Sequence, residues 1–219
     1  MHNRSPFRLL ALAALLIASP TFAAEPGAVA GRADLPDKPE ASVSSQRYSN
    51  IVGKIGTPKE HVGVVWLEGD FPSEASDATK TVTIGQRNYQ FEHAVAAVPV
   101  GAKVLFPNHD DAYHNVFSYS KAKRFDLGRY LKDETPPAVV FDKAGIIQLY
   151  CEIHEHMRST LIVVDSPHYT TTDPQGNFRL ENLPVGDFTL KAWLGGRKFI
   201  ERKVTVTEGR TLEMTIASK

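Results

Sequence analysis

The chain is poor in cysteine and has no excess of charge of either sign. Its 219 residues contain one cysteine, Cys151, so no disulfide can form within the chain. The 25 basic residues equal the 25 acidic ones, and the basic excess that nucleic-acid binding usually needs is therefore missing. Beyond a short N-terminal run, no stretch reaches the roughly 20 apolar residues of a membrane-spanning helix. We expect no nucleic-acid partner and no integral membrane segment once that run is removed.

The first residues have the pattern of a secretory signal. Arg4 and Arg8 precede the apolar run LLALAALLIA, and the small residues of SPTFAAE follow it. We predict a signal peptide over residues 1–23, with cleavage after Ala23, and hence a periplasmic or secreted protein; an uncleaved anchor is the alternative. A lone thiol in an oxidising compartment is either reactive or occupied. Metal ligation would occupy it.

The rest of the chain has the pattern of an all-β protein. Short apolar runs with period-two alternation are separated by Gly, Pro, Asn and Asp turn signals, which predicts β-sandwich architecture. The run AVAAV also fits a helical turn, but we expect a strand there. Residues 24–47 are rich in Pro, Ala, Gly and Ser without sustained apolar periodicity. They predict a flexible linker without packed structure.

The segment CEIHEHM joins the only cysteine to two further soft ligands. His154 follows Cys151 by three residues, and Met157 follows it by six. A thiolate, an imidazole and a thioether on one tight loop favour copper over hard cations. Upstream, the β-prone segment YHNVFS holds His114, the candidate for a second imidazole. Two imidazoles and a thiolate with a weak axial thioether form the blue-copper arrangement of electron-transfer proteins.

These motifs resemble the cupredoxin family. The likeness rests on the HNV segment, the apolar strand IIQLY before the cysteine, and the Cys-x-x-His-x-x-Met spacing, and it is closer to amicyanins than to plastocyanins. It covers residues 80–165 and implies a Greek-key β-sandwich with one type-1 copper ion. The ligands that the resemblance implies are His114, Cys151, His154 and Met157. Glu155 stands where amicyanin-like loops have proline, which leaves this ligand set unchanged.

Neighbouring residues leave alternatives open. His156 competes with Met157 for the axial position, although its expected place is the surface beside the copper, where pH could tune the site. A buried structural thiol, or a nucleophile with His154 as its base, is the metal-free interpretation of Cys151. The Asn115 side chain is expected to hydrogen-bond the loop that carries the cysteine and to tune the sulfur.

The C-terminal region forms a second β unit. The patterns TDPQGNF and LPVGDF, each followed by an alternating strand, resemble the carboxypeptidase regulatory-like module, a small transthyretin-like β-sandwich. The strand pair that opens this module lies upstream in IVGKIGTPKEHVGVVWLEG. We therefore predict a split module over residues 48–72 and 166–219, with the cupredoxin domain inserted between the halves. In the alternative, the upstream strands belong to the cupredoxin and the units are consecutive. Trp66 and Trp193 are expected in one core of the module.

Together these features predict an exported copper protein that carries single electrons and is not an enzyme. Its expected partner is a redox protein such as a c-type cytochrome or a dehydrogenase. No general base or substrate-activating constellation stands out in the sequence. Two alternatives are a protein that binds or buffers copper and a cell-envelope interaction scaffold whose copper is structural.

Overall fold

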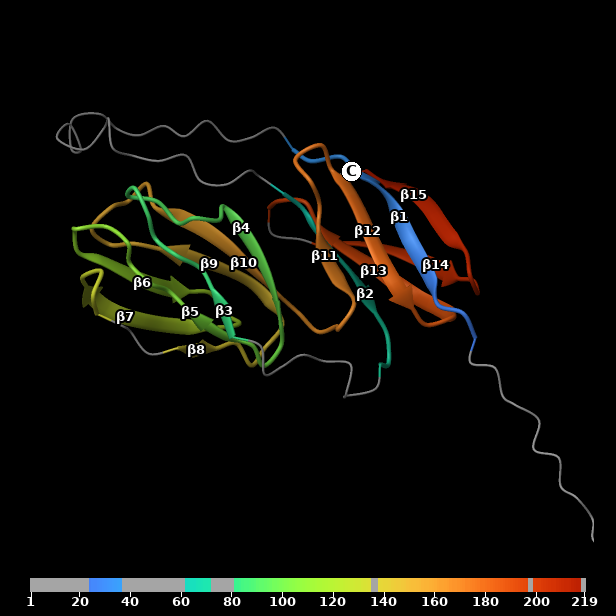
Figure 1. Cartoon of the computed structure of the whole chain (residues 1–219), viewed down its shortest axis with the longest axis horizontal. Coiled ribbons are helices and arrows are strands. Elements are labelled where there is room, and N and C mark those ends of the chain that lie inside the picture. The colour runs from blue at the N-terminus through green and yellow to red at the C-terminus, as the bar shows by residue number, and fades with distance from the viewer. Residues whose placement is uncertain (1–23, 37–61, 72–80, 135–137, 197–198, 218–219) are drawn as a thin grey trace, which may run out of the picture.

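The computed structural model describes residues 24–36, 62–71, 81–134, 138–196 and 199–217. Within these ranges the protein has fifteen strands and no helix, which confirms the predicted all-β class. The strands form two sandwiches that follow one another along the long axis of the molecule (Figure 1). None of the described segments is a helix that could span a membrane. The predicted signal peptide and the predicted strand SNIVGKI lie outside the described residues.

We call the first sandwich, which carries the predicted metal ligands, the ligand sandwich. Its larger sheet has the order β4-β10-β9-β6-β7, and its smaller sheet has the order β3-β5-β8. The run AVAAV belongs to β4, as expected, and pairs in parallel with β10. The strands are β3 (Thr81–Thr83), β4 (Val95–Pro99), β5 (Lys103–Leu105), β6 (His114–Tyr119), β7 (Arg124–Tyr130), β8 (Val139–Val140), β9 (Gly145–Tyr150) and β10 (Arg158–Val164).

The core of the ligand sandwich reaches the predicted metal ligands. It contains Phe106 and Phe141, both fully buried, and continues to Cys151 and Met157. Strand β7 was not predicted, because its sequence RFDLGRY places charged residues on an exposed edge where apolar alternation is weak. Strand β9 was predicted from its apolar run IIQLY. The ligand loop therefore starts from a strand that the core holds firmly.

We call the second sandwich the outer sandwich. One sheet has the order β12-β1-β15, and the other has the order β11-β2-β13-β14. The prediction of two β-sandwiches is thus confirmed. The strands are β1 (Gly27–Ala33), β2 (Val64–Glu68), β11 (Tyr169–Thr171), β12 (Asn177–Leu183), β13 (Gly186–Trp193), β14 (Ile200–Val206) and β15 (Thr211–Ile216).

Strand β1 corrects the first part of the predicted flexible linker over residues 24–47, whose residues 37–47 lie outside the described ranges. It is the central strand of its sheet, antiparallel to β12 and parallel to β15 (Figure 1). Val29 and Ala33 are buried in the core of the outer sandwich. A Cβ on Gly31 would collide with the backbone carbonyl of Met214, so the close approach of β15 requires glycine. The small residues that suggested a linker allow β1 and β15 to pack closely.

Strand β2 makes the pairing that a split module requires. It pairs antiparallel with β13 on one side and with β11 on the other. Hydrogen bonds across large sequence distances reinforce the join: the Ser166 hydroxyl donates to the Leu67 carbonyl at 2.6 Å, and the Gly63 amide donates to Thr172 Oγ1 at 2.9 Å. Strands β1 and β2 therefore belong to the outer sandwich, β3 to β10 form the ligand sandwich, and β11 to β15 complete the outer sandwich.

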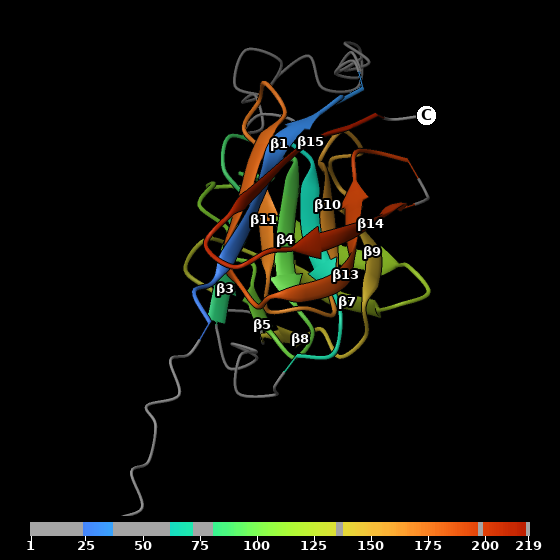
Figure 2. The same cartoon turned by 90° about the vertical axis from the view of Figure 1, so that its right-hand side faces the viewer.

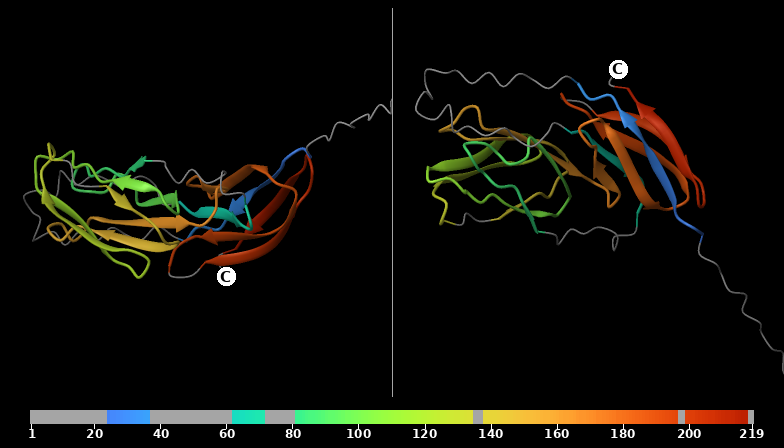
Figure 3. Two further views of the ribbon diagram at one scale, coloured as in Figure 1. Left: turned by 90° about the horizontal axis from the view of Figure 1, so that it is seen from below. Right: turned by 45° about the horizontal axis from the view of Figure 1, so that its top comes forward.

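Trp66 and Trp193 share one buried cluster, but this cluster is not the interior of the outer sandwich. Along β2, Val65 and Leu67 face that interior, whereas Trp66 faces the opposite way. The tryptophans pack with β4 and β10 through Val95, Ile162 and Val164. The two tryptophans thus share one core, as predicted, but this core lies between the sandwiches and not inside the module. They join the two sandwiches, which lie one behind the other in Figure 2 and side by side in Figure 3.

Candidate metal centre

Neighbouring strands of the ligand sandwich bring the predicted ligands to one end of the sheet. His114 is the first residue of β6, and Cys151 directly follows the last residue of β9. These strands are paired through Phe117 and Tyr150. The loop after β9 turns back tightly, since the backbone amide of Met157 donates to the carbonyl of His154 at 2.9 Å. This hydrogen bond closes the turn between His154 and Met157.

The side chains of His114, Cys151 and His154 converge on one buried point. The two Nδ1 atoms of the histidines are 3.0 Å apart, and Cys151 Sγ is 3.9 Å from His154 Nδ1. One donor atom from each of the three residues lies within 4.8 Å of the others. They are the only group of this kind found among the described residues. Their exposed fractions are 0%, 3% and 8%.

Both histidines are poised as neutral ligands. Burial, followed by the proximity of His114 and His156, lowers the pKa of His154 to about 4. Burial also lowers the pKa of His114, against the opposing effect of the Asp110 carboxylate. Near pH 7 each imidazole therefore keeps a lone pair for a metal. No proton has to be displaced from an imidazolium before binding.

The donor set fits a soft metal ion. An ion bonded at about 2.0 Å to nitrogen and about 2.3 Å to sulfur holds its donors roughly 3 to 4 Å apart. The separations of 3.0 and 3.9 Å agree with this geometry. No carboxylate belongs to the cluster, and nitrogen with thiolate sulfur suits copper or zinc better than magnesium or calcium. Two imidazoles and one thiol, with Met157 buried in the same apolar cluster as Cys151, favour copper over zinc.

Met157 and His156 differ in environment. Met157 is fully buried and packs in the same apolar cluster as Cys151. His156 is half-buried, and its Nε2 lies 2.9 Å from the Tyr89 carbonyl oxygen. It was expected at the surface, but the segment that carries Tyr89 covers it. The axial role of Met157 stays a prediction. The ring of His156 contacts the backbone of the turn that carries Tyr89.

Asn115 makes the hydrogen bond expected of it. Its Oδ1 accepts from the backbone amide of Glu152 at 2.8 Å, directly after Cys151 in the chain. Its Nδ2 donates to Asp126 Oδ1 at 3.1 Å, which orients the amide. The residue therefore ties β6 to the backbone that directly follows Cys151.

Sequence reasoning missed two residues at the centre. The Asp110 carboxylate lies 2.9 Å from His114 Nε2. The Tyr89 ring meets both ligand histidines edge to face, with centroid distances of 5.8 Å to His114 and 5.1 Å to His154. The spacing of aspartate four residues before a predicted histidine ligand was a usable signal. Tyr89 had none, because only the tertiary structure brings its turn to the site.

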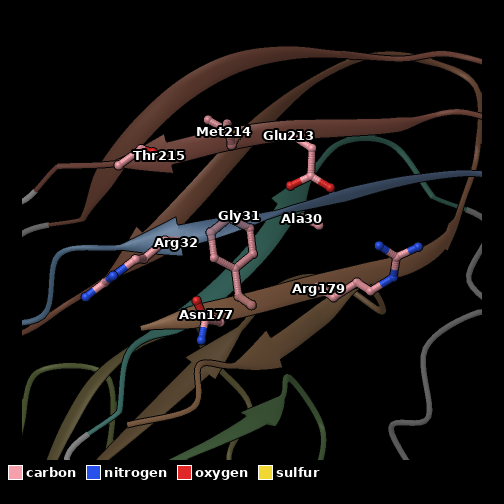
Figure 4. Close-up of a pocket in the computed structure, with 9 residues that line it drawn as sticks. Ala30, Gly31, Arg32, Asn177, Arg179, Glu213, Met214 and Thr215 are labelled. Carbon is pink, nitrogen blue, oxygen red and sulfur yellow. The ribbon is translucent and has the colours of Figure 1, made fainter. Parts of the chain in front are cut away.

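A separate hollow lies on the outer sandwich. Figure 4 shows it over the sheet β12-β1-β15, with polar side chains that include Arg32, Arg179 and Glu213. None of its lining residues is a histidine or a cysteine. It is therefore distinct from the metal centre, and its lining offers neither an imidazole nor a thiol.

Comparison with protein families gives a match in the C-terminal part of the chain. Residues 158–219 match the model of the carboxypeptidase regulatory-like domain. This is one of the two families that the sequence patterns resemble. The match starts at β10, so its first residues lie in the ligand sandwich and not in the outer sandwich.

Comparison with solved structures returns cupredoxins. The copper-containing nitrite reductase of Thermus scotoductus SA-01 is 24% identical with a TM-score of 0.37, over 39% of this chain and 23% of the reductase. The chain thus spans less than a quarter of that protein. An amicyanin variant in the Cu(I) form is 19% identical with a TM-score of 0.36, over 46% of this chain and 98% of amicyanin. Comparison with curated proteins gives no match.

Proposed function

We propose that the protein is an exported mononuclear copper protein that carries single electrons between redox partners. The observation that carries the proposal is the buried convergence of two imidazole nitrogens and the only thiol of the chain. Such a donor set, with Met157 as a weak axial ligand, is the blue-copper arrangement. The expected partner is a c-type cytochrome or a dehydrogenase, and the expected location is the periplasm or the exterior.

Three protein features support electron transfer rather than substrate chemistry. When bound, a copper ion supplies the one-electron chemistry. His114 and Cys151 are held by paired strands, and the loop turn holds His154, so the ligands need little movement between oxidation states. The apolar core around Cys151 limits the access of water to the sulfur. Burial of the centre leaves little space for a substrate beside the ion.

Copper loading of the mature chain tests this proposal. We expect one Cu(II) per chain, an intense visible absorption from thiolate-to-copper charge transfer, and a reversible one-electron couple. Rapid reduction or oxidation by a c-type cytochrome, followed by stopped-flow absorbance, would support the role as a carrier. His114→Ala should abolish the band, while His109→Ala, at an exposed histidine outside the cluster, should retain it. A colourless copper-loaded protein would contradict the proposal.

Replacing the axial candidate should change the potential without loss of copper. Met157→Leu keeps the apolar volume but removes the thioether, and a lost weak donor destabilises Cu(II) more than Cu(I). We expect a higher reduction potential by voltammetry and a retained visible band. The matched control is Met214→Leu, at a half-buried methionine of the outer sandwich, which should leave the potential unchanged. An unchanged potential in Met157→Leu would remove this residue from the ligand set.

A further inference from the structure

The Asp110 carboxylate receives three hydrogen bonds at the edge of the metal centre. Its Oδ2 lies 2.9 Å from His114 Nε2 and accepts the Tyr89 amide at 2.8 Å, while its Oδ1 accepts the Asn88 amide at 2.7 Å. The side chain is 10% exposed. Its own backbone amide donates to Asn108 Oδ1 at 2.9 Å. The carboxylate is therefore well ordered and shielded from water.

One of these hydrogen bonds selects the tautomer of His114. A carboxylate oxygen accepts only, so Nε2 of His114 must carry the proton and donate it. The other ring nitrogen, Nδ1, is then left with its lone pair directed toward the cluster, 3.0 Å from His154 Nδ1. Anionic acceptors behind a ligand histidine fix the ring and increase its donor strength.

The other two hydrogen bonds hold a strained turn over the centre. Asn88 and Tyr89 both have positive φ, 53° and 56°. Arg87 and Gln90 exchange backbone hydrogen bonds of 2.8 and 3.2 Å around them, as in a two-residue hairpin turn. Glycine usually takes the second position, and a tyrosine there costs free energy. In return, the turn brings the Tyr89 ring into edge-to-face contact with the imidazoles of both predicted ligands.

We propose that Asp110 is a positioning residue of the metal centre. One carboxylate presents the lone pair of His114 to the metal and, through the same atoms, keeps the turn with Tyr89 closed over both imidazoles. The inference rests on the proposed function for the identity of the metal. Its geometry does not depend on copper, because every contact is within the protein.

Removing the charge of Asp110 should weaken copper binding. In Asp110→Asn only one side-chain oxygen remains, so the three donors can no longer all be paired, and the acceptor behind His114 is neutral. Loss of such a partner typically reduces metal affinity by about 10- to 100-fold. Because a weaker imidazole donor disfavours Cu(II), we also expect a higher reduction potential. Without these hydrogen bonds the turn that carries Tyr89 should open and expose the centre to water.

Asp111→Asn is the matched control. Asp111 is adjacent and loses the same charge, but its side chain is 88% exposed and forms an ion pair with Lys132. Copper affinity is measured by competition with a chelator, and the potential by voltammetry, on full mature chains whose metal-free folding is first checked by thermal unfolding. A loss confined to Asp110→Asn supports the proposal. Equal affinity and potential in the two variants would overturn it.

The wild-type protein without metal gives a second test that needs no substitution. Long-range ¹H–¹⁵N spectra of the full mature chain report which ring nitrogen of His114 carries the proton. We expect the Nε2–H tautomer, and the Nδ1–H tautomer would overturn the proposal. Failure of the wild type to bind copper would instead refute the proposed function, and the tautomer would still decide the role of Asp110.

Discussion

Cys151→Ser is expected to abolish the visible absorption of the copper-loaded protein. The band requires a thiolate sulfur bonded to Cu(II), and Cys151 is the only cysteine of the chain. Serine is nearly isosteric, but its hydroxyl stays protonated near pH 7 and is a poor ligand for a soft metal. Copper affinity should therefore fall by orders of magnitude while the metal-free fold persists.

The control for this substitution is His156→Ala. His156 neighbours the site but lies outside the cluster of three donors, so this variant should keep the visible band. Absorbance after titration with Cu(II), together with thermal unfolding of each metal-free variant, separates ligand loss from misfolding. A blue Cys151→Ser protein would exclude the thiolate centre. Loss of the band in His156→Ala would show that His156, not Met157, completes the ligand set.

Removing β1 is expected to unfold the outer sandwich. Strands β12 and β15 meet only through β1 in their sheet, and Val29 and Ala33 leave the core with it. A chain that starts at residue 37 should therefore lose the dispersed NMR signals of the outer sandwich and become sensitive to protease, unlike a chain that starts at residue 24. Unpaired strand edges should also promote aggregation. A stable, protected outer sandwich without β1 would contradict its central place.

A point substitution tests the same strand without truncation. In Gly31→Ala the added methyl group meets the Met214 carbonyl, which cannot move without breaking the sheet. Overpacking of this kind costs typically about 1–3 kcal/mol, and backbone contact places this case at about 3 kcal/mol. Thr215→Ala, at an exposed position of β15, should change the free energy of unfolding by less than about 0.5 kcal/mol. Denaturant unfolding compares the two, and equal stabilities would refute the close approach.

The joined sandwiches affect how a partner can meet the metal centre. Val64, Trp66 and Trp193 pack against Ile162 and Val164, which lie on the outer face of β10. The opposite face of the same strand contributes Leu161 and Val163 to the core beneath the metal ligands. An apolar interface of this kind restricts the relative motion of the two sandwiches more than linkers do. We expect a partner to approach the centre in few orientations.

Local patterns were sufficient for the strands that contain continuous apolar alternation. The apolar run IIQLY and the alternating segment FTLKAWL predicted β9 and β13, and the spacing of Cys151, His154 and Met157 indicated a candidate ligand loop. The pattern fails where burial comes from a partner strand. β1 has glycine and alanine because β15 approaches closely, and this reason is invisible in its own composition.

The sequence by itself determined the all-β class, the candidate donor types and the presence of two β-sandwiches, because alternation and donor chemistry are properties of local residues. Only the tertiary structure decided the rest. It turned the predicted linker into a central strand, directed Trp66 and Trp193 to the boundary between sandwiches, and brought Asp110 and Tyr89 to the ligand histidines. These outcomes depend on which strand faces cover one another and on contacts between residues distant in the chain, and neither is encoded in a local pattern.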